Sequence, residues 1–386
     1  MAESTNTTHK EPRAVHGGTT SRRALPGGGD ASPAGGTPQA ATPFTLDNLL
    51  WAARQCLRGC GWKDGTARFR RNLLGNCRRL EQELATGKYR MAKPNLFEIT
   101  SPKRRTVNSL LLRDRIVHKV ICHQGGLTRD LFRSAYLDNC ACQAGKGTSF
   151  AIRRFELHLR RHFSRHGCAG LCLSYDIRHF FDSIPQDKLV NFVYRKVRNP
   201  QVRALTAQVI RSYSLAEPGR GIGLGSEISQ NLANAYLTPL DYVCKQRLGI
   251  SGYVRYADNF LLLVPPSVTA REIADMCDRA VREVLGTLGL ELNPKSCRIP
   301  IGGTIPFLGF GFTLSPSGRI DRTPLRTSYV RIRRRLKRLM RKVRSGEITP
   351  AQVWASVQAW ASYRQPGDLA ARRLQDQIQE ELRQCR

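Results

Sequence analysis

The sequence predicts a mixed fold of the α/β (α+β) type, in which helices alternate with strands that supply carboxylates. Two short apolar runs, 171–177 and 252–264, have the length and residue types of strands, and each contains an aspartate. Helical spacing of apolar residues fills most of the chain around them. The 386 residues, 41% of them hydrophobic, suffice for one large core or for two to three subdomains.

The N-terminal part is expected to be helical after a disordered extension. Residues 1–43 are rich in Gly, Ser, Thr, Pro and Ala and lack apolar periodicity, which predicts disorder. Helical spacing begins in 44–60 and continues through 67–87. A short strand is expected at 96–99, and 105–126 returns to helical spacing.

The central part combines strands and helices. The run 171–177 predicts a strand that ends in a carboxylate, and 252–264 predicts a strand, a tight turn and a second strand. Helical spacing covers three further segments: 192–213, 228–249 and 272–292, the last of which leads into a strand.

The C-terminal part begins with a strand at 305–314 and a Pro-Ser-Gly turn, and helices follow Pro324. Residues 331–344 contain nine Lys or Arg and no acid. On a helix, Leu336, Met340 and Val343 share one packing face. A second face, able to follow a phosphate backbone, carries five arginines: Arg331, Arg334, Arg335, Arg338 and Arg341.

The charge balance indicates a polyanionic partner. Lys and Arg number 62 against 30 Asp and Glu, which gives a net charge of +32. An enzyme of small neutral substrates does not need such an excess, whereas a nucleic acid or a membrane surface attracts it. No stretch is long and apolar enough to span a bilayer, and the polar first residues predict no signal peptide. We therefore expect a cytoplasmic protein without a membrane partner.

The twelve cysteines are scattered and form no C-x-x-C pair, so a zinc ribbon is not predicted. Several lie in apolar runs, which favours reduced thiols that fill the core. His158, His162 and His166 recur on one helical face near Cys168. A zinc site there is an alternative to histidines that face the core or RNA.

Two aspartates have the placement of metal ligands. Asp176 ends an apolar strand, and Asp258 lies at the tip of the hairpin expected at 252–264. If both strands belong to one sheet, the carboxylates can lie side by side and bind Mg²⁺ together with substrate phosphates. The backbone carbonyl of Ile177 is a candidate further ligand. Surface or capping carboxylates are the ordinary alternative for such a pair.

Seven motifs follow one another in the order found in reverse transcriptases. Over about residues 88–365 the sequence resembles that family, and within it the enzymes of diversity-generating retroelements. The block at 225–230 is similar to the G-x-x-x-S-Q signature of that group, and Tyr256–Asn259 resembles the Y-x-D-D box. The other motifs are 105–107 with 114–118, 132–151, 175–184, 293–295 and 307–310.

The resemblance implies a right-hand polymerase with fingers, a palm built on an antiparallel sheet with helices, and a helical thumb. Fingers and palm would span 44–314, and a basic thumb would span 315–386. The implied activity is RNA-directed DNA synthesis with two Mg²⁺ ions, Mn²⁺ being possible. The implied partners are template RNA, a cDNA or primer strand, deoxynucleoside triphosphates and a small basic accessory protein.

The resemblance also assigns roles to individual residues. The catalytic residues would be Asp176, Asp258 and Asn259, and the metal would be bound by Asp176, Ile177 and Asp258. The primer would be gripped by Phe307, Leu308 and Gly309. The nucleotide-binding residues would be Arg105, Phe181, Leu224, Gly225, Gln230 and Lys295. For Arg105, Phe181 and Lys295, a surface or core role remains the alternative.

Two positions depart from the commoner reverse-transcriptase pattern. Leu224 stands where many of these enzymes have a Gln that can hydrogen-bond the substrate, and diversity-generating enzymes resemble this chain in having an apolar residue there. The resemblance therefore implies error-prone synthesis opposite template adenines. Asn259 replaces the second Asp of the box, and a neutral amide is a poorer ligand for a hard cation. We expect an active enzyme with slower turnover or altered metal preference.

Two other interpretations remain open. The chain could be a retron, group II intron-like or phage-defence reverse transcriptase, although Ser229 and Gln230 argue against the intron type. It could also be a catalytically weak RNA-binding factor on a palm scaffold, with Asn259 as the mark of lost activity. The intact Asp176 and Asp258 argue against this second interpretation.

Overall fold

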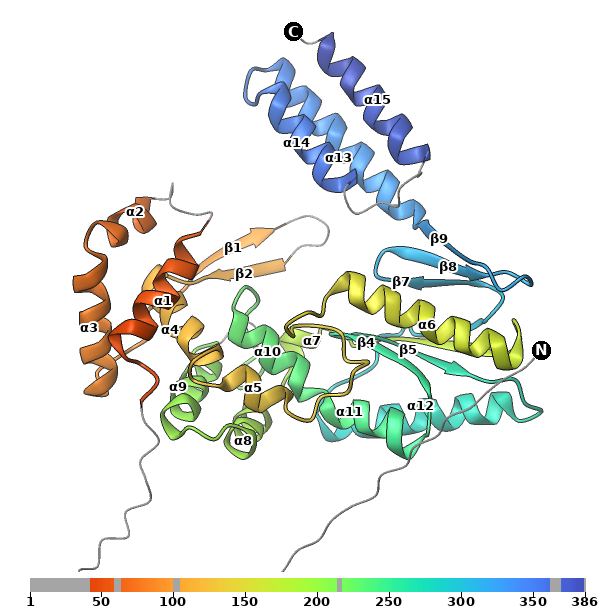
Figure 1. The fold of residues 1–386 in the computed structure, drawn as a ribbon, viewed down its shortest axis with the longest axis horizontal. Helices are drawn as coiled ribbons and strands as arrows, with labels where there is room; N and C mark the ends of the chain where they lie inside the picture. Colours follow the sequence, from red (N-terminus) through yellow and green to blue (C-terminus); the bar gives the residue numbers. More distant parts are fainter. Residues whose placement is uncertain (1–41, 59–63, 100–104, 214–216, 362–368, 385–386) are drawn as a thin grey trace, which may run out of the picture. The chain divides into compact units, whose positions relative to one another are not determined.

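A computed structural model describes residues 42–58, 64–99, 105–213, 217–361 and 369–384 (Figure 1). Of the extension expected to be disordered, residues 1–41 lie outside the described part. The predicted mixed architecture is confirmed, because the described residues form helices together with three antiparallel sheets. The division at residue 315 stays a prediction.

The central sheet has four strands in the order β4-β5-β3-β6, and every neighbouring pair is antiparallel. The expected strand at 171–177 is β3, and the expected hairpin at 252–264 is β4 and β5. The strands are β3 (Leu171–Asp176), β4 (Gly252–Tyr256), β5 (Asn259–Val264) and β6 (Cys297–Pro300).

Side chains alternate along each strand, so β3 and β5 of the central sheet contribute residues to a core on each face. Leu173 and Tyr175 face a large core that includes α10 (Glu227–Tyr236) and α12 (Ala270–Thr287). Cys172 faces a second core that includes α6 (Thr148–His166). Figure 1 shows α6 and α12 on opposite sides of the sheet.

The remaining helices of residues 42–250 enclose the large core with α10. Phe44, Leu49, Ile116 and Leu127 are almost completely buried there. These helices are α1 (Leu46–Leu57), α2 (Asp64–Arg71), α3 (Leu73–Ala85), α4 (Leu112–Cys122), α5 (Leu127–Phe132), α7 (Phe180–Ser183), α8 (Gln186–Lys196), α9 (Pro200–Arg211), α11 (Thr238–Tyr242) and the π-helix η1 (Val243–Arg247).

Three segments predicted as single helices are divided. The 67–87 segment breaks at Asn72, whose side chain accepts a hydrogen bond from the Gly75 amide and caps α3. The 192–213 segment breaks before Asn199, which caps α9. The 228–249 segment becomes α10, α11 and η1, with Pro239 near the start of α11. Apolar periodicity continues across these breaks and conceals the caps.

The prediction of a helix over 105–126 was wrong for its first residues. Strand β2 (Arg105–Ser109) pairs with β1 (Asn95–Ile99), the strand expected at 96–99. The Asn108 amide also donates to the Leu224 carbonyl at 2.9 Å. These non-local bonds determine the strand, so helical spacing near 105 did not reveal it.

The single strand expected at 305–314 is instead a hairpin. Strands β7 (Thr304–Phe307) and β8 (Phe310–Leu314) are joined by Leu308 and Gly309, which have φ of 48° and 87°. The expected Pro-Ser-Gly turn then leads to β9 (Ile320–Pro324), which pairs with β8. The positive φ values reverse the chain inside a continuous apolar run.

The C-terminal part forms a helical bundle with its own apolar cluster. Leu336 and Met340 are buried and Val343 is partly buried, which confirms the predicted packing face. Trp354 and Trp360 pack against the same cluster. The helices are α13 (Arg326–Arg344), α14 (Pro350–Ala361) and α15 (Leu369–Arg383).

No disulfide joins the cysteines of the described part, and seven of these ten cysteines are buried. This agrees with the expectation of core-filling thiols; Cys60 and Cys385 lie outside the described residues. Among the helices that the structure describes, none combines the length and apolar character that crossing a membrane requires.

Candidate active site at one end of the central sheet

Asp258 lies in the turn between β4 and β5, beside the end of β3. Asp176, the last residue of β3, is paired with Asn259, the first residue of β5. The Ile177 amide donates a hydrogen bond to the Asp258 carbonyl oxygen at 3.2 Å. The structure therefore brings Asp176, Ile177, Asp258 and Asn259 to one end of one sheet.

Asn293 holds the Asp176 carboxylate in place. Its side-chain nitrogen donates to Oδ2 of Asp176 at 2.8 Å, and its backbone amide donates to the Asp176 carbonyl at 2.8 Å. The Asp176 amide donates to the Ser296 hydroxyl at 3.4 Å. The motif at 293–295 drew attention to this loop, but the contact from Asn293 to Asp176 could not be read from the sequence.

The oxygen atoms at this end of the sheet fit a hard divalent cation. Mg²⁺ binds one or two carboxylates, and substrate phosphates and water complete its coordination. Oδ1 of Asn259 is buried and has no hydrogen-bond partner among the described residues, so a nearby cation would satisfy it. Among the described residues, no three His, Cys, Asp or Glu side chains form a metal site. The chain alone thus offers two carboxylates and an amide oxygen.

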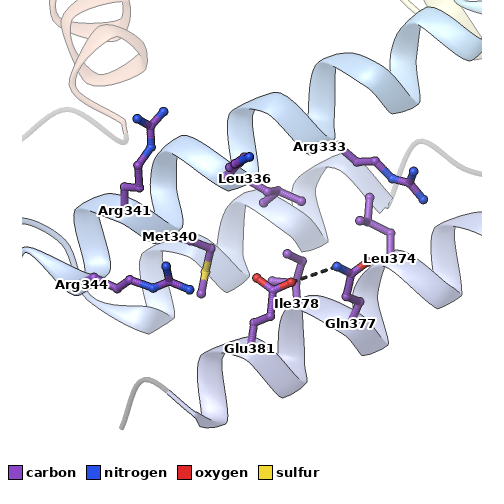
Figure 2. Close-up of a pocket in the computed structure, with 10 residues that line it drawn as sticks. Arg333, Leu336, Met340, Arg341, Arg344, Leu374, Gln377, Ile378 and Glu381 are labelled. Carbon is purple, nitrogen blue, oxygen red and sulfur yellow. Dashed lines mark hydrogen bonds between the residues drawn. The ribbon is translucent and has the colours of Figure 1, made fainter.

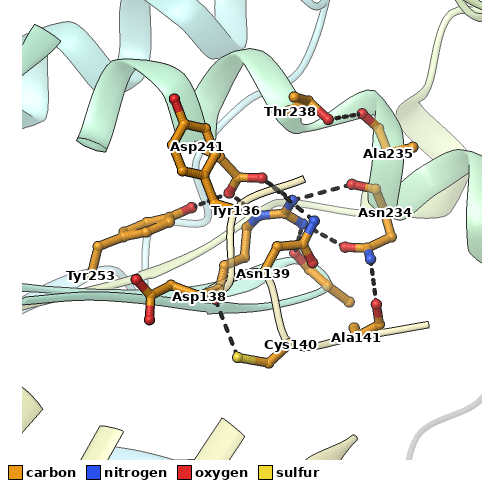
Figure 3. Close-up of polar contacts among 12 residues, drawn as sticks. Tyr136, Asp138, Asn139, Cys140, Ala141, Asn234, Ala235, Thr238, Asp241 and Tyr253 are labelled. Atoms are coloured by element: carbon orange, nitrogen blue, oxygen red, sulfur yellow. Dashed lines mark hydrogen bonds and ion pairs between the residues drawn. The ribbon is translucent and has the colours of Figure 1, made fainter. Parts of the chain in front are cut away.

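A buried polar network, which the sequence analysis missed, lies beside this turn (Figure 3). Arg255 of β4 and Asp241 of α11 are both completely buried and form an ion pair at 2.6 Å. Asn234 and Tyr253 complete the network with hydrogen bonds of 2.7 Å to Arg255 and 2.6 Å to Asp241. An arginine inside an apolar strand was the signal in the sequence that could have revealed it.

The block that contains Leu224 and Gly225 packs closely against β2. Gly225 has φ of 108°, and a Cβ there would lie 2.8 Å from the Asn108 carbonyl oxygen. A Cβ at Gly223 would lie 1.6 Å from the Tyr213 ring, so only glycine fits. Leu224 is half-buried, and its carbonyl accepts from Asn108.

Phe181 is bonded to the segment that leads into this block. Its carbonyl oxygen accepts from the Ile222 amide at 2.9 Å, two residues before Leu224. Its ring meets Phe180 edge-on at 5.5 Å between centroids. Phe180 is buried and Phe181 only half-buried, so the two rings are not equivalent core residues. A role for Phe181 in selecting sugars stays a prediction.

Four predicted nucleotide-binding residues are exposed: Gly225, described above, and Arg105, Gln230 and Lys295. Lys295 is linked to Asp176 through Asn293. The Lys295 amide donates to the Asn293 side chain at 3.0 Å, and that side chain in turn donates to Asp176. Arg105 begins β2, and Gln230 lies in the first turn of α10. Neither is linked to Asp176 by a hydrogen bond among the described residues, so their roles stay predictions.

The residues predicted to grip the primer lie at the reversal of hairpin β7–β8. Phe307 is buried against Phe155 of α6, with 5.5 Å between ring centroids. Leu308 and Gly309 form the turn itself, and Gly309 is exposed. The expected strand geometry at Leu308 and Gly309 was therefore wrong, while the gripping role is untested.

The motif at 114–118 has a structural function in the described chain. Asp114 is fully buried and accepts hydrogen bonds from the Tyr89 hydroxyl at 2.7 Å and the Ala92 amide at 3.2 Å; burial raises its pKa. His118 lies 3.2 Å from the Ser226 hydroxyl, and burial lowers its pKa to about 4. This motif therefore joins α4 to the Gly225 block.

The histidines of α6 are bonded to protein groups. His158 contacts a carboxylate oxygen of Asp138 at 2.8 Å, and His162 contacts the Ala169 carbonyl at 2.7 Å. His166 is exposed and its ring lies 5.1 Å from that of His162. The zinc alternative finds no support in the part of the chain that the structure describes.

A basic groove of about 580 Å³ runs between α13 and α15 (Figure 2). Leu336 and Met340 of α13, with Leu374 and Ile378 of α15, form its apolar walls. On α15, Gln377 donates to Glu381 at 2.9 Å. The cationic side chains at the groove all belong to α13: Arg333, Lys337, Arg341 and Arg344.

The chain matches no protein-family model and no curated protein. Among solved structures it is similar to telomerase from Candida albicans in complex with the TWJ fragment of telomeric RNA, with 12% identity and a TM-score of 0.47 over 81% of this chain and 65% of that one. It is also similar to apo telomerase from Candida tropicalis, with 13% identity and a TM-score of 0.46 over 60% of this chain and 48% of that one. This chain spans less than two thirds of each telomerase, and similarities this weak carry no functional argument.

Proposed function

We propose that this protein is an RNA-directed DNA polymerase that uses divalent metal ions. The observation that supports this most directly is the pairing of β3 with β5, which brings Asp176 and Asp258 to one end of the sheet. The net charge of +32 is in keeping with a nucleic-acid template. The alternative role of surface carboxylates does not explain the buried, unpartnered amide oxygen of Asn259 beside them.

In the proposed reaction, the 3′-hydroxyl of a primer attacks the α-phosphate of a nucleoside triphosphate, and pyrophosphate leaves. Two bound Mg²⁺ ions would supply Lewis acidity for the hydroxyl and for the triphosphate. Asp176 and Asp258 would hold the ions, and Asn293 keeps the Asp176 carboxylate in one orientation. Arg105 contacts the triphosphate, and Lys295 protonates the leaving pyrophosphate.

The right-hand arrangement belongs to the same proposal. The central sheet would be the palm, and the helices and strands of 44–165 with part of 184–220 would be the fingers. Helices α13–α15 would be the thumb, whose basic groove offers Arg333, Lys337, Arg341 and Arg344 to a phosphate backbone. The β7–β8 turn would hold the primer end.

We further propose that synthesis is error-prone, as in a diversity-generating retroelement. Leu224 is half-buried, and its side chain has no group that can hydrogen-bond a mispaired substrate. The narrow approach of Gly225 to Asn108 leaves the Leu224 backbone little freedom to compensate. A retron, group II intron-like or phage-defence enzyme would share the catalytic residues but is expected to be more faithful.

The test is primer extension by the purified protein on a defined RNA template, with deoxynucleotides and either Mg²⁺ or Mn²⁺, followed by sequencing. Asp176→Ala serves as the inactive variant, and Asp321→Ala, an exposed carboxylate of β9, is the matched control. Loss of extension in Asp176→Ala alone, with errors at template adenines, supports both proposals. Faithful product keeps the polymerase and removes the mutagenic role.

The remaining outcome concerns the alternative that the protein is an RNA-binding factor without polymerase activity. Wild-type protein that binds RNA but extends no primer with either metal contradicts the polymerase and supports an RNA-binding factor. RNA binding is measured against salt concentration, because each phosphate contact adds about 0.7–0.9 to the logarithmic slope. Arg333→Gln with Arg341→Gln, which removes two groove residues of α13, should lower the slope. Arg271→Gln with Arg282→Gln on α12 removes the same charge and should not.

A further inference from the structure

The guanidinium of Arg255 contacts the turn that carries Asp258. Its Nη1 donates to the Ala257 carbonyl oxygen at 3.1 Å and to Oδ1 of Asn234 at 2.7 Å. Ala257 is the residue before Asp258, and its φ of 54° lies in the left-handed region. Arg255 therefore fixes the peptide plane that directly precedes Asp258.

A second hydrogen bond fixes the peptide on the other side of Asp258. The Ile177 amide donates to the Asp258 carbonyl at 3.2 Å. With both neighbouring peptides held, the Cα–Cβ direction of Asp258 is determined by Arg255 from one side and by β3 from the other. The side chain of Asp258, which is half-buried, therefore starts from a fixed Cα–Cβ direction.

The position of the guanidinium is in turn fixed by residues of α11 and α10. Nε and Nη2 of Arg255 donate to the two carboxylate oxygens of Asp241 at 2.7 and 2.6 Å, a bidentate contact. Nη2 also donates to the Asn234 carbonyl at 3.2 Å. The neighbouring segment adds two backbone bonds, from Cys140 to the Arg255 carbonyl and from Arg255 to the Asp138 carbonyl, each 2.9 Å.

We propose that Arg255 is a positioning residue that sets the orientation of Asp258 for a divalent cation, with Asp241 and Asn234 holding its guanidinium. This inference rests on the proposed function. A buried ion pair costs several kcal/mol of desolvation and often adds no net stability over apolar residues. The contact with Ala257 gives this pair a purpose that apolar residues could not replace.

The competing explanation is that the network only stabilises the fold. Two members of the network allow the explanations to be separated. Tyr253 donates a hydrogen bond to Asp241 at 2.6 Å, and Asn139 donates a second one to Asp241 at 3.5 Å. Neither of these bonds involves the turn. Tyr253→Phe therefore weakens the network without removing the bond to Ala257. Arg255→Met combined with Asp241→Leu removes that bond but leaves no unpaired buried charge.

The experiment measures Mn²⁺ affinity of the full chain by EPR, together with the melting temperature. The same variants are compared in primer extension for kcat, for KM of the nucleotide and for half-saturating Mg²⁺. For the double variant we expect a folded protein whose Mn²⁺ affinity and kcat fall by about tenfold to a hundredfold, with KM unchanged. Tyr253→Phe should keep the wild-type Mn²⁺ affinity and the wild-type kcat.

A folded double variant with wild-type Mn²⁺ affinity overturns the inference. If the double variant does not fold, Arg255→Lys decides, because one ammonium cannot reach Asp241 and the Ala257 carbonyl with the same geometry. Weakened Mn²⁺ binding in a folded Arg255→Lys supports the inference, and unchanged binding overturns it. A wild type that binds Mn²⁺ but extends no primer contradicts the proposed polymerase alone.

Discussion

Hairpins β4–β5 and β7–β8 both reverse on two residues, and the chain stabilises them in different ways. The first turn, Ala257–Asp258, receives hydrogen bonds from Arg255 and from Ile177. The second turn, Leu308–Gly309, closes on the apolar pair Phe307 and Phe310 and uses positive φ at both residues.

The difference shows what a turn needs when it carries chemistry. A turn that only connects strands can rely on a glycine and on apolar packing. A turn that must present a carboxylate in one direction needs directional bonds on both of its peptides. Four predictions test this contrast, from the largest expected effect to the smallest.

Asp258→Ala should reduce primer extension by at least about a thousandfold, because a metal ligand contributes several kcal/mol to the transition state. The melting temperature should change little, since the carbonyls of Ala257 and Asp258 keep their hydrogen bonds to Arg255 and Ile177 in the variant. Extension rates and thermal unfolding of the same preparation check both statements. Retention of one tenth of the wild-type rate would remove Asp258 from the proposed site.

The stability of the region around hairpin β4–β5 should also depend on acid pH. Asp138, in the segment bonded to β4, is buried, which raises its pKa, but hydrogen bonds from His158 and Arg154 outweigh this and hold the pKa at about 2. Its contribution, about 2 kcal/mol, is present above pH 4 and is lost as the pH falls towards 2. The free energies of unfolding of the wild type and of Asp138→Asn should therefore converge as the pH falls from 4 towards 2. A difference between them that stays constant over this range contradicts the prediction.

Gly309→Ala should destabilise the protein by about 1–2 kcal/mol, because its φ of 87° is costly for any residue with a Cβ. A Cβ at this position meets no atom within 4 Å, so the cost comes from the backbone alone. Denaturant titration measures it. An effect below about 0.5 kcal/mol would mean that the turn rearranges freely.

Ala257→Gly should change stability by less than about 1 kcal/mol, since relief of the left-handed strain offsets the greater freedom of glycine in the unfolded chain. The same titration tests it. If Arg255 holds this turn, the variant should also keep the wild-type Mn²⁺ affinity. A large loss of affinity would show that the methyl group, and not the hydrogen bonds, fixes the turn.

Local patterns were sufficient for the features that depend on neighbouring residues in the chain. The apolar run ending in Asp176, the tight turn at Asp258 and the packing face of Leu336 and Met340 were all predicted and are present. Each follows from a period of 2 or 3.6 residues or from turn composition.

The features that were missed depend on contacts far apart in the sequence. Strand β2 is determined by its pairing with β1 and by the Leu224 carbonyl, more than a hundred residues away. Arg255 is a charge inside an apolar strand, which indicates a buried partner, but only the structure identifies that partner as Asp241. Asn293 reaches Asp176 from a loop 117 residues away.

Cys297 gives the chain a natural attachment point for a reporter group. It is exposed on β6 and pairs with Ser174 of β3, two residues from Asp176. Buried thiols such as Cys77 react slowly, because burial raises the pKa, here to about 11. Among the cysteines of the described part, a spin label should therefore prefer Cys297. From there, paramagnetic broadening would report the arrival of manganese without any engineered residue.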